Sequence, residues 1–574
     1  MTDQTTHSAT TRGPSRAVVF QYALAILVAM LVAAPLLPIV YQSFLSGALY
    51  DADSTLTLRN YARLFEYAEL PSVAINSVLF SVLATLIAQV VGVTAAILLG
   101  RTDMPGRRFF GAILLWPLFI SHLVLAVGWV LAYGPTGIIS SAIKLWIGPE
   151  PWNLYSLAGA AMVEGVALAP FTILFCLGST ALGNAALEDA ARCCGASPWR
   201  TLTRVTLPLL KPAILYSGML NFTSAIDTLA VPLVLGEPAG IHFFATFIYQ
   251  IGISAPQPNY GVVGVAAVLL LVIVSALVWL QARMLGDSRR FVTLGGKAGV
   301  KRVFRLNALR WPAFALVMAY AVFAIIVPMG TLIIRSLVSF LSPLVPFWTV
   351  MTLDNYVMIF TQPDHQRAIL NTLFIAVVGA GIATTFYAFI AIVAQRSDFR
   401  FRRPLEYVAL APRAVPGLIA GLGFFYAMLI FPPMTALSGT VGVVMFAYVM
   451  RYIPTGFAAL SPSLLQIEGD MDRAARVAGA GWITVSWRIV RGLIKPALVS
   501  CYCILFIAFL KEYNAALFLR APGNEVIGTS LITYWVGGQM GVVAALSVFQ
   551  IAVTAIFIAL ARKFWKVDLG GAKL

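Results

Sequence analysis

Apolar residues in this chain fall into long runs separated by short polar segments, and that pattern predicts its secondary structure. An α-helix needs about 20 predominantly apolar residues to cross a bilayer, and runs of that length recur along the whole chain. We read them as twelve spans, over residues 17–43, 74–99, 109–133, 156–182, 207–235, 260–282, 311–338, 368–394, 405–431, 437–460, 494–519 and 541–561. The pattern therefore predicts an all-α membrane protein.

Composition and charge agree with this prediction. Hydrophobic residues make up 60% of the chain and charged residues 11%, whereas soluble domains carry roughly 25% charged residues. The net charge is +16, from 39 Lys and Arg against 23 Asp and Glu. With the N-terminus in the cytoplasm, nearly all basic residues between spans fall on the cytoplasmic side; those outside are Arg59, Arg63, Lys144 and Arg367. This asymmetry predicts a multi-pass protein with both termini cytoplasmic, in contact with membrane lipids and not with nucleic acid.

The chain also contains an internal duplication. Positions before the second span recur 295 residues later: Leu58, Asn60, Tyr61 and Asn76 return as Leu353, Asn355, Tyr356 and Asn371. Segment Glu188–Ala213 recurs as Asp472–Ala497, with ten of 26 positions identical. The predicted domains are a cytoplasmic tail (1–16), a first six-span repeat (17–285), a basic cytoplasmic linker (286–310), a second six-span repeat (311–562) and a cytoplasmic tail (563–574). An even number of spans gives both halves the same orientation.

The duplicated segment lies on the predicted cytoplasmic side, between the fourth and fifth spans of each half. In the first copy Asn184 is placed to cap a short helix, and Glu188 lies early in it, where the helix dipole favours acids. Gly195 can end that helix in the left-handed conformation. Ser197 and Pro198 then mark the start of a second helix. A helix–turn–helix used twice suggests a docking surface for a partner that also comes in twos.

These residues resemble the signature of permease subunits of binding-protein-dependent ABC importers. That family carries a cytoplasmic E-A-A-x-x-x-G loop, which docks into the nucleotide-binding subunit as a coupling helix. The matching residues are Glu188, Asp189, Ala190, Ala191 and Gly195 in the first copy, and Asp472, Ala474, Ala475 and Gly479 in the second. The resemblance covers nearly the whole chain and implies two tandem six-helix type I ABC importer permease repeats in a bacterial inner membrane. Asp472 departs from the family's Glu, which leaves equal coupling through the two loops open.

The resemblance also implies partners and a cargo. An ABC ATPase homodimer would bind the paired loops and hold ATP and Mg²⁺, and a periplasmic or lipid-anchored solute-binding protein would deliver the solute. This chain has no P-loop around its Gly296-Lys297 pair, so we predict neither enzyme activity nor a cofactor for it. The fused, duplicated form looks most like the ferric iron permeases. Thiamine, a polyamine and aminoethylphosphonate are the alternative cargoes.

Ionisable residues inside predicted spans are costly in a bilayer and are therefore functional candidates. They are Glu164, Asp227, Arg451, Lys511 and Glu512. The repeat relates Asp227 to Glu512 by a shift of 285, so these two acids can lie symmetrically around a central substrate pathway, with Glu164 as a further candidate. Alternatively, each acid is a structural hydrogen-bond partner, and Lys511 neutralises Glu512. An acidic pair would suit a cationic cargo, and no spacing of His or Cys indicates a metal site.

A twelve-span secondary transporter is the alternative from a different class. Its support is the stretch Gly100-x-x-Asp103-x-x-Gly106-Arg107-Arg108 between the second and third spans, which faintly resembles the loop signature of the major facilitator class. The spacing is off by one, the Arg expected after the Asp is missing, and the second half has no glycine-containing counterpart. The duplicated docking loop therefore favours the importer.

Overall fold

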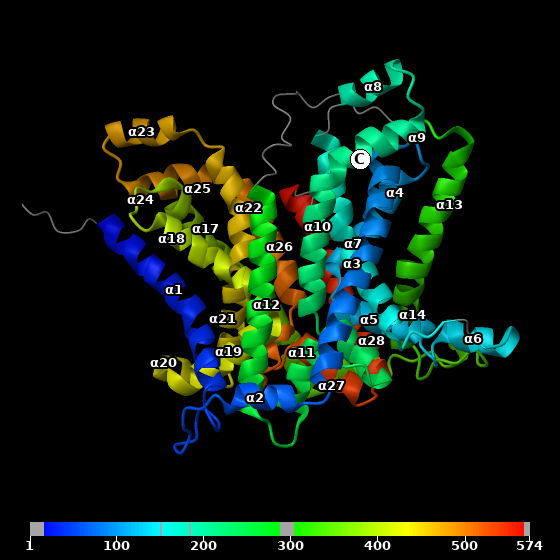
Figure 1. Ribbon diagram of the computed structural model, residues 1–574, viewed down its shortest axis with the longest axis horizontal. Helices are drawn as coiled ribbons and strands as arrows, with labels where there is room; N and C mark the ends of the chain where they lie inside the picture. Colours follow the sequence, from blue (N-terminus) through cyan, green and yellow to red (C-terminus); the bar gives the residue numbers. More distant parts are fainter. Residues whose placement is uncertain (1–15, 150–151, 183–184, 287–303, 567–574) are drawn as a thin grey trace, which may run out of the picture.

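The computed structural model describes residues 16–149, 152–182, 185–286 and 304–566. Most of the predicted tails and of the predicted linker lie outside these described residues. Within these described residues, eight helices are long and apolar enough to cross a membrane, and the number of spans rises to twelve if each of four bent helix pairs counts as one. Figure 1 shows them as one upright bundle. The predicted fold class, an all-α membrane protein, is confirmed.

The helices of the first half are α1 (Arg16–Ser43), α2 (Arg59–Glu66), α3 (Leu70–Arg101), α4 (Arg107–Leu115), η1 (Trp116–Phe119), α5 (His122–Tyr133), α6 (Ile138–Trp146), α7 (Leu157–Leu182), α8 (Ala185–Cys193), α9 (Pro198–Thr201), η2 (Leu202–Thr206), α10 (Leu207–Asp227), η3 (Pro232–Gly236), η4 (Glu237–Ala239), α11 (Phe244–Tyr249), η5 (Gln250–Ser254) and α12 (Tyr260–Gly286).

The helices of the second half are η7 (Asn307–Leu309), α13 (Arg310–Ala321), η8 (Val322–Ile326), α14 (Val327–Ser336), η9 (Phe347–Thr349), α15 (Asp354–Thr361), α16 (Pro363–Phe374), η10 (Ile375–Gly379), α17 (Ala380–Arg396), α18 (Arg402–Leu410), η11 (Ala411–Ala414), α19 (Gly417–Ile430), α20 (Pro432–Thr435), α21 (Val441–Arg451), α22 (Ile453–Leu465), α23 (Gly469–Val477), α24 (Trp482–Val485), η12 (Ser486–Val490), α25 (Arg491–Leu493), α26 (Lys495–Lys511), η13 (Asn514–Ala516), α27 (Ile527–Val536) and α28 (Met540–Trp565).

The predicted spans agree with these helices in place, but several that we predicted as continuous are broken. The predicted span 207–235 bends by 54° after Asp227, and 405–431 bends by 110° before α19. The predicted span 494–519 ends its long helix at Lys511. Proline explains the bend before α19, because Pro416, the residue before Gly417, has no N–H to continue a helix. Backbone polar groups freed at such breaks need partners inside the protein.

The first span of each half packs against the other half. Helix α1 contacts α19, and α14 contacts α5. Two glycines 295 positions apart allow this approach: a Cβ at Gly423 would lie 2.3 Å from the carbonyl oxygen of Pro35 in α1, and one at Gly128 would lie 3.0 Å from that of Pro328 in α14. In Figure 1, α1 and α13 accordingly lie on opposite sides of the bundle. The two halves are therefore interlocked, and not simply adjacent.

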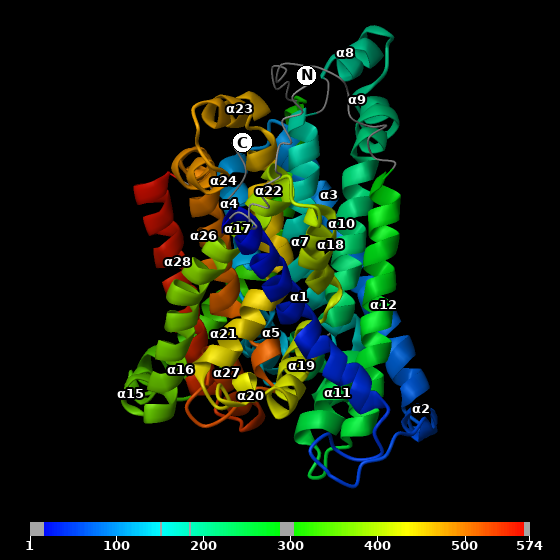
Figure 2. The ribbon, with the colours of Figure 1, turned by 90° about the vertical axis from the view of Figure 1, so that its left-hand side faces the viewer.

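The duplicated loops lie together at one end of the bundle. Figures 1 and 2, which are turned by 90° from each other, both show α8 and α23 at that end and α2 and α20 at the opposite one. We call these the loop end and the opposite end. Two copies of one helix–turn–helix thus lie at the same end of the bundle, as expected if each half has an even number of spans.

Candidate functional site

The two copies of the predicted docking loop share one backbone geometry. After that prediction we call residues 185–206 the first coupling loop and residues 469–490 the second coupling loop. Gly195 has a φ of +80° and Gly479 a φ of +82°. In each loop the residue after this glycine donates its N–H to the carbonyl five positions earlier, at 3.0 Å. Glycine is needed because other residues resist a positive φ, and this pairing satisfies carbonyls at the helix end. The predicted left-handed end of the first helix is confirmed, and the second loop repeats it.

The second helix of the first loop also begins as predicted. Helix α9 starts at Pro198, and the backbone N–H of Arg200 donates to Ser197 Oγ at 3.3 Å. Ser197 therefore caps this helix. Asn184, the predicted cap of the preceding helix, lies outside the described residues.

Glu188, which we predicted as part of the docking surface, is turned toward its own chain. Its carboxylate lies 3.6 Å from the guanidinium of Arg101 at the end of α3, and it accepts a hydrogen bond of 2.9 Å from Thr206 Oγ1. The residue is only 5% exposed. Glu188 therefore fastens the first coupling loop to the bundle, because one partner ends the second span and the other lies at the far end of the same loop.

Around the second coupling loop, the described contacts at the equivalent place involve Arg396 and Trp482. Arg396, which the repeat relates to Arg101, donates to the carbonyls of Leu464 at 3.0 Å and Ile467 at 2.8 Å. The indole N–H of Trp482 in turn donates to the carbonyl of Arg396 at 3.0 Å. Asp472, the predicted counterpart of Glu188, belongs to α23, but its side chain lies outside the described part.

Both loops expose apolar side chains that would otherwise be expected in a core. Leu187 and Trp199 of the first loop are exposed, as are Met471 and Val477 of the second, with Val477 at 90%. The alanines at the predicted contact positions Ala190 and Ala474 are exposed as well. Apolar surface clustered on a polar end of a protein is typical of a contact with another protein.

The two acids that the repeat relates converge on a single arginine within the bundle. Arg451 Nη2 lies 3.2 Å from Asp227 Oδ2, and Arg451 Nε lies 3.4 Å from Glu512 Oε2. The second carboxylate oxygen of Asp227 accepts a hydrogen bond of 3.2 Å from the N–H of Gly417 at the start of α19, where the helix dipole favours an anion. A Cβ at Gly417 would lie 2.0 Å from Arg451 Nη1, so this position requires glycine.

Glu512 is held further by its own half. Tyr452 donates its hydroxyl to Glu512 Oε2 at 2.7 Å, and the N–H of Asn514 donates to Oε1 at 2.9 Å. Lys511 does not form an ion pair with Glu512 here; its ammonium donates to the carbonyl of Leu118, in the break of the third span, at 2.7 Å. Each carboxylate oxygen of Asp227 and of Glu512 therefore has a partner within the protein.

The third predicted acid, Glu164, pairs with a histidine. Glu164 is fully buried, and its Oε1 lies 3.1 Å from Nδ1 of His122, the first residue of α5.

Sequence reasoning found Arg451 as a charge within a span but did not connect it to the acids. The contact joins residues 224 positions apart, and the repeat gave no signal for it, because its counterpart in the first half is not an arginine. Tyr452 was missed entirely, since a tyrosine in a span is ordinary.

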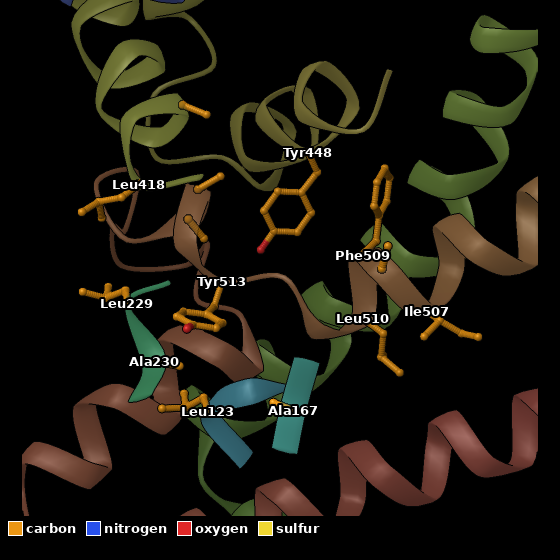
Figure 3. Close-up of a cluster of buried hydrophobic side chains, with 14 of the residues drawn as sticks. Leu123, Ala167, Leu229, Ala230, Leu418, Tyr448, Ile507, Phe509, Leu510 and Tyr513 are labelled. Carbon is orange, nitrogen blue, oxygen red and sulfur yellow. The ribbon is translucent and has the colours of Figure 1, made fainter. Parts of the chain in front are cut away.

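Apolar side chains from both halves fill the region around these charges. Figure 3 shows Leu123, Leu229, Leu418 and Tyr513 gathered between the helix breaks of the two halves. Leu123 and Leu418 are 295 positions apart, and all four side chains are buried. The starts of α5 and α19, which follow the breaks in the two third spans, and the segments after α10 and α26 therefore meet in one apolar cluster.

A cavity of about 730 Å³ lies toward the opposite end, between the two halves. Its walls combine aromatic and polar groups, among them Tyr155, Glu237, Gln250, Arg335 and Trp535. Among the residues that the structure describes, no group of three or more His, Cys, Asp or Glu is placed to hold a metal ion.

Taken together, the described features define a multi-span membrane protein whose two interlocked halves meet at a central contact and present paired loops at one end. The family model for the inner membrane component of binding-protein-dependent transport systems matches residues 66–290. The sulfate transport system permease protein CysW of Synechocystis is 30% identical over 35% of this chain and 72% of that protein. The chain belongs to this family of transport permeases.

Other relatives match along most of the chain. The putative ferric transport system permease protein FbpB 1 of Haemophilus influenzae is 27% identical over 83% of this chain and 74% of its own length. The ferric transport system permease protein FbpB of Actinobacillus pleuropneumoniae is 26% identical over 86% and 71%. A crystal structure of a bacterial ABC transporter involved in the import of alginate aligns with half of this chain, at 14% identity and a TM-score of 0.38.

Family membership confirms the predicted class. The chain is the permease component of an ABC importer, built as a fused pair of permease repeats and located in the inner membrane. A permease subunit is not an enzyme, and ATP hydrolysis belongs to a separate subunit of such a system. The secondary transporter alternative is thereby excluded.

Proposed function

We propose that this permease imports ferric iron, which a periplasmic or lipid-anchored solute-binding protein delivers at the opposite end of the bundle. The similarity to two ferric transport permeases, each over more than four-fifths of this chain, supports this cargo. In this proposal iron is cargo, so it passes through and needs no resident set of ligands.

The loop end faces the cytoplasm in this proposal, and both termini lie there. An ABC ATPase homodimer docks on the two coupling loops and binds ATP and Mg²⁺. The observation that carries this assignment is the pair of like-built loops at one end, each with an exposed apolar surface. A twofold partner needs two equivalent contact surfaces, and these loops supply them.

Transport follows from the central contact between the halves. The starts of α5 and α19 and the ends of the fifth-span helices α10 and α26 surround Leu123, Leu229, Leu418 and Tyr513 (Figure 3). The fifth spans continue from the coupling loops; in the first half, α9 and η2 run directly into α10. Closure of the ATPase dimer on the loops would therefore move the fifth spans and separate the central apolar side chains. The 730 Å³ cavity then lies on the route that cargo takes toward this gate.

Reconstitution into liposomes tests both parts of the proposal. The permease is purified with its ATPase and its binding protein, and uptake of ⁵⁵Fe³⁺ is measured with unlabelled thiamine, putrescine or 2-aminoethylphosphonate as competitors. We expect iron uptake that requires ATP hydrolysis and resists all three competitors. The matched control carries an ATPase that binds but does not hydrolyse ATP. Uptake driven by an ion gradient without the ATPase would contradict the energy source, and ATP-driven uptake of a competitor alone would replace the cargo.

A further inference from the structure

The segment that leads from the linker into the second half is bound to the first half near its coupling loop. The N–H of Phe304 donates to the carbonyl of Arg101 at 2.7 Å, and the N–H of Asp103 donates to the carbonyl of Phe304 at 3.2 Å. The N–H of Leu306 donates to Asp103 Oδ1 at 2.8 Å. Three hydrogen bonds therefore fix residues 304–306 alongside residues 101–103, about 200 positions earlier in the chain.

The same segment touches the first coupling helix directly. The guanidinium carbon of Arg192, in the last turn of α8, lies 4.3 Å from the centre of the Phe304 ring. That distance is within the range of a cation–π contact. Arg101, whose carbonyl binds Phe304, also pairs with Glu188 of α8 through its side chain. Helix α8 is thus held at Glu188, near its middle, and at Arg192, near its end. The partners of these two residues, Arg101 and Phe304, are hydrogen-bonded to each other.

From this segment the chain continues into the first span of the second half. Helix α13 contacts α4, with the rings of Phe110 and Phe314 5.4 Å apart. Helix α14, which follows, packs against α5, and α5 begins beside the central contact. Residues 304–306, which we call the Phe304 segment, therefore connect the first coupling loop to the first span of the second half, which packs against the first half.

The second coupling loop is built differently at this point. The carbonyl of Arg396, the repeat counterpart of Arg101, accepts its hydrogen bond from Trp482, which belongs to the second coupling loop itself. A local side chain fills the place that a backbone N–H from the other half fills in the first loop.

We propose that Phe304 is a positioning residue for the first coupling helix. Its ring supports Arg192 and holds α8 in the orientation that the partner ATPase engages, and it passes movement of α8 to α13 and α14. This role rests on the proposed function, in which α8 is a docking site. If Phe304 has this role, the end of the linker positions the first coupling loop and does not merely connect the two permease repeats.

The test compares two replacements of Phe304 in the full importer complex. Phe304→Leu keeps an apolar side chain but removes the π face, whereas Phe304→Trp keeps that face. The first readout is the ratio of ⁵⁵Fe³⁺ transported to ATP hydrolysed. We expect a fall of about two- to fivefold for Phe304→Leu, the size expected for loss of an exposed cation–π contact, and a near-normal ratio for Phe304→Trp. Arg192→Gln should match Phe304→Leu, and the double variant should add little.

The second readout follows α8 without the ATPase. Cys193 and Cys194 are exposed, whereas Cys176, Cys501 and Cys503 are buried, so a nitroxide placed on Cys193 in a Cys194→Ala background reports the mobility of the helix end. We expect a more mobile label with Phe304→Leu and an unchanged one with Phe304→Trp. Phe401→Leu is the matched control, because Arg400 lies over Phe401 at 5.8 Å in the second half. It should change neither readout.

The outcomes separate the positioning role from the importer assignment. Unchanged transport ratio and label mobility in Phe304→Leu, or equal effects of Leu and Trp, would overturn the positioning role. Failure of the unaltered complex to transport with ATP would instead count against the proposed function, and the label mobility would still decide whether Phe304 holds α8.

Discussion

The two acids that the internal repeat relates hold different parts of the molecule. Asp227 belongs to the first half, but its partners Arg451 and Gly417 both belong to the second. Glu512 binds Arg451, Tyr452 and Asn514, all within its own half. Duplication placed two acids at equivalent helix ends. After divergence, Asp227 connects the two halves, whereas Glu512 stabilises contacts within the second half. Symmetry of position is therefore no guide to symmetry of role.

The coupling loops differ in the same way. The backbone turns at Gly195 and Gly479 are nearly identical in φ, whereas different groups bind the equivalent carbonyls of Arg101 and Arg396. The backbone N–H of Phe304 binds the first carbonyl, and the indole N–H of Trp482 binds the second. Main-chain geometry survived the duplication because the local turn demands it, while the donor to this carbonyl could be exchanged.

The largest effect should come from the arginine that both acids share. Arg451→Met leaves Asp227 and Glu512 as buried acids without their cation, which we expect to cost about 3–5 kcal/mol. Thermal unfolding in detergent and the yield of folded protein measure this loss. The triple variant Arg451→Met, Asp227→Asn, Glu512→Gln removes all three charges and should recover much of the stability. If Arg451→Met alone were as stable as the unaltered protein, the ion pairs of Arg451 with Asp227 and Glu512 would not stabilise the fold.

The individual acids should have smaller and distinguishable effects. Asp227→Asn and Glu512→Gln each leave Arg451 with one carboxylate, at an expected cost of about 1–3 kcal/mol. Hydrogen exchange should rise at the start of α19 and the end of α10 for Asp227→Asn, and around α21 and the end of α26 for Glu512→Gln. Uptake of ⁵⁵Fe³⁺ per folded complex should be unchanged in both. Reduced uptake at normal stability would instead place these acids on the cargo pathway.

The two glycine turns allow a matched comparison of the coupling loops. Gly195→Val and Gly479→Val should each cost about 1–2 kcal/mol locally, because a β-branched residue resists a positive φ. A Cβ at either position meets no atom within 4 Å, so the strain is the same and no clash is added. Transport should fall in both while membrane insertion persists, with Gly195→Asn and Gly479→Asn as tolerant controls. Since the strain is equal, any difference in transport measures unequal coupling, and we expect Gly195→Val to be the more damaging. Normal transport in both would contradict docking through these loops.

The smallest effect should come from the local anchor of the second loop. Trp482→Phe removes one hydrogen bond to the carbonyl of Arg396, worth about 0.5–1.5 kcal/mol. We expect a slightly more mobile α23, measured by a spin label on an introduced Met471→Cys, and an unchanged label on Cys193 in the first loop. A change in the first loop would show that the two anchors are linked.

The sequence alone determined the features that depend on local pattern. Apolar runs of sufficient length set the places of the spans, and the duplication predicted two similarly oriented halves. The turn at Gly195 followed from its local residues, because a helix end and a positive φ are decided within a few positions. The same local reasoning identified Asp227, Glu512 and Arg451 as charges within spans.

Only the tertiary structure decided which of these groups meet. The crossing of α1 and α14 into the opposite halves, the convergence of two acids on Arg451, the inward turn of Glu188 and the contact of Phe304 with Arg192 all join residues far apart in the chain. Asp227 and Arg451, for example, are separated by 224 positions. Hydrophobic length and periodicity specify that a helix crosses the membrane, but they carry no information on its neighbours. The neighbours of each helix depend on close backbone approach at Gly128 and Gly423. They also depend on the requirement that every buried charge has a partner.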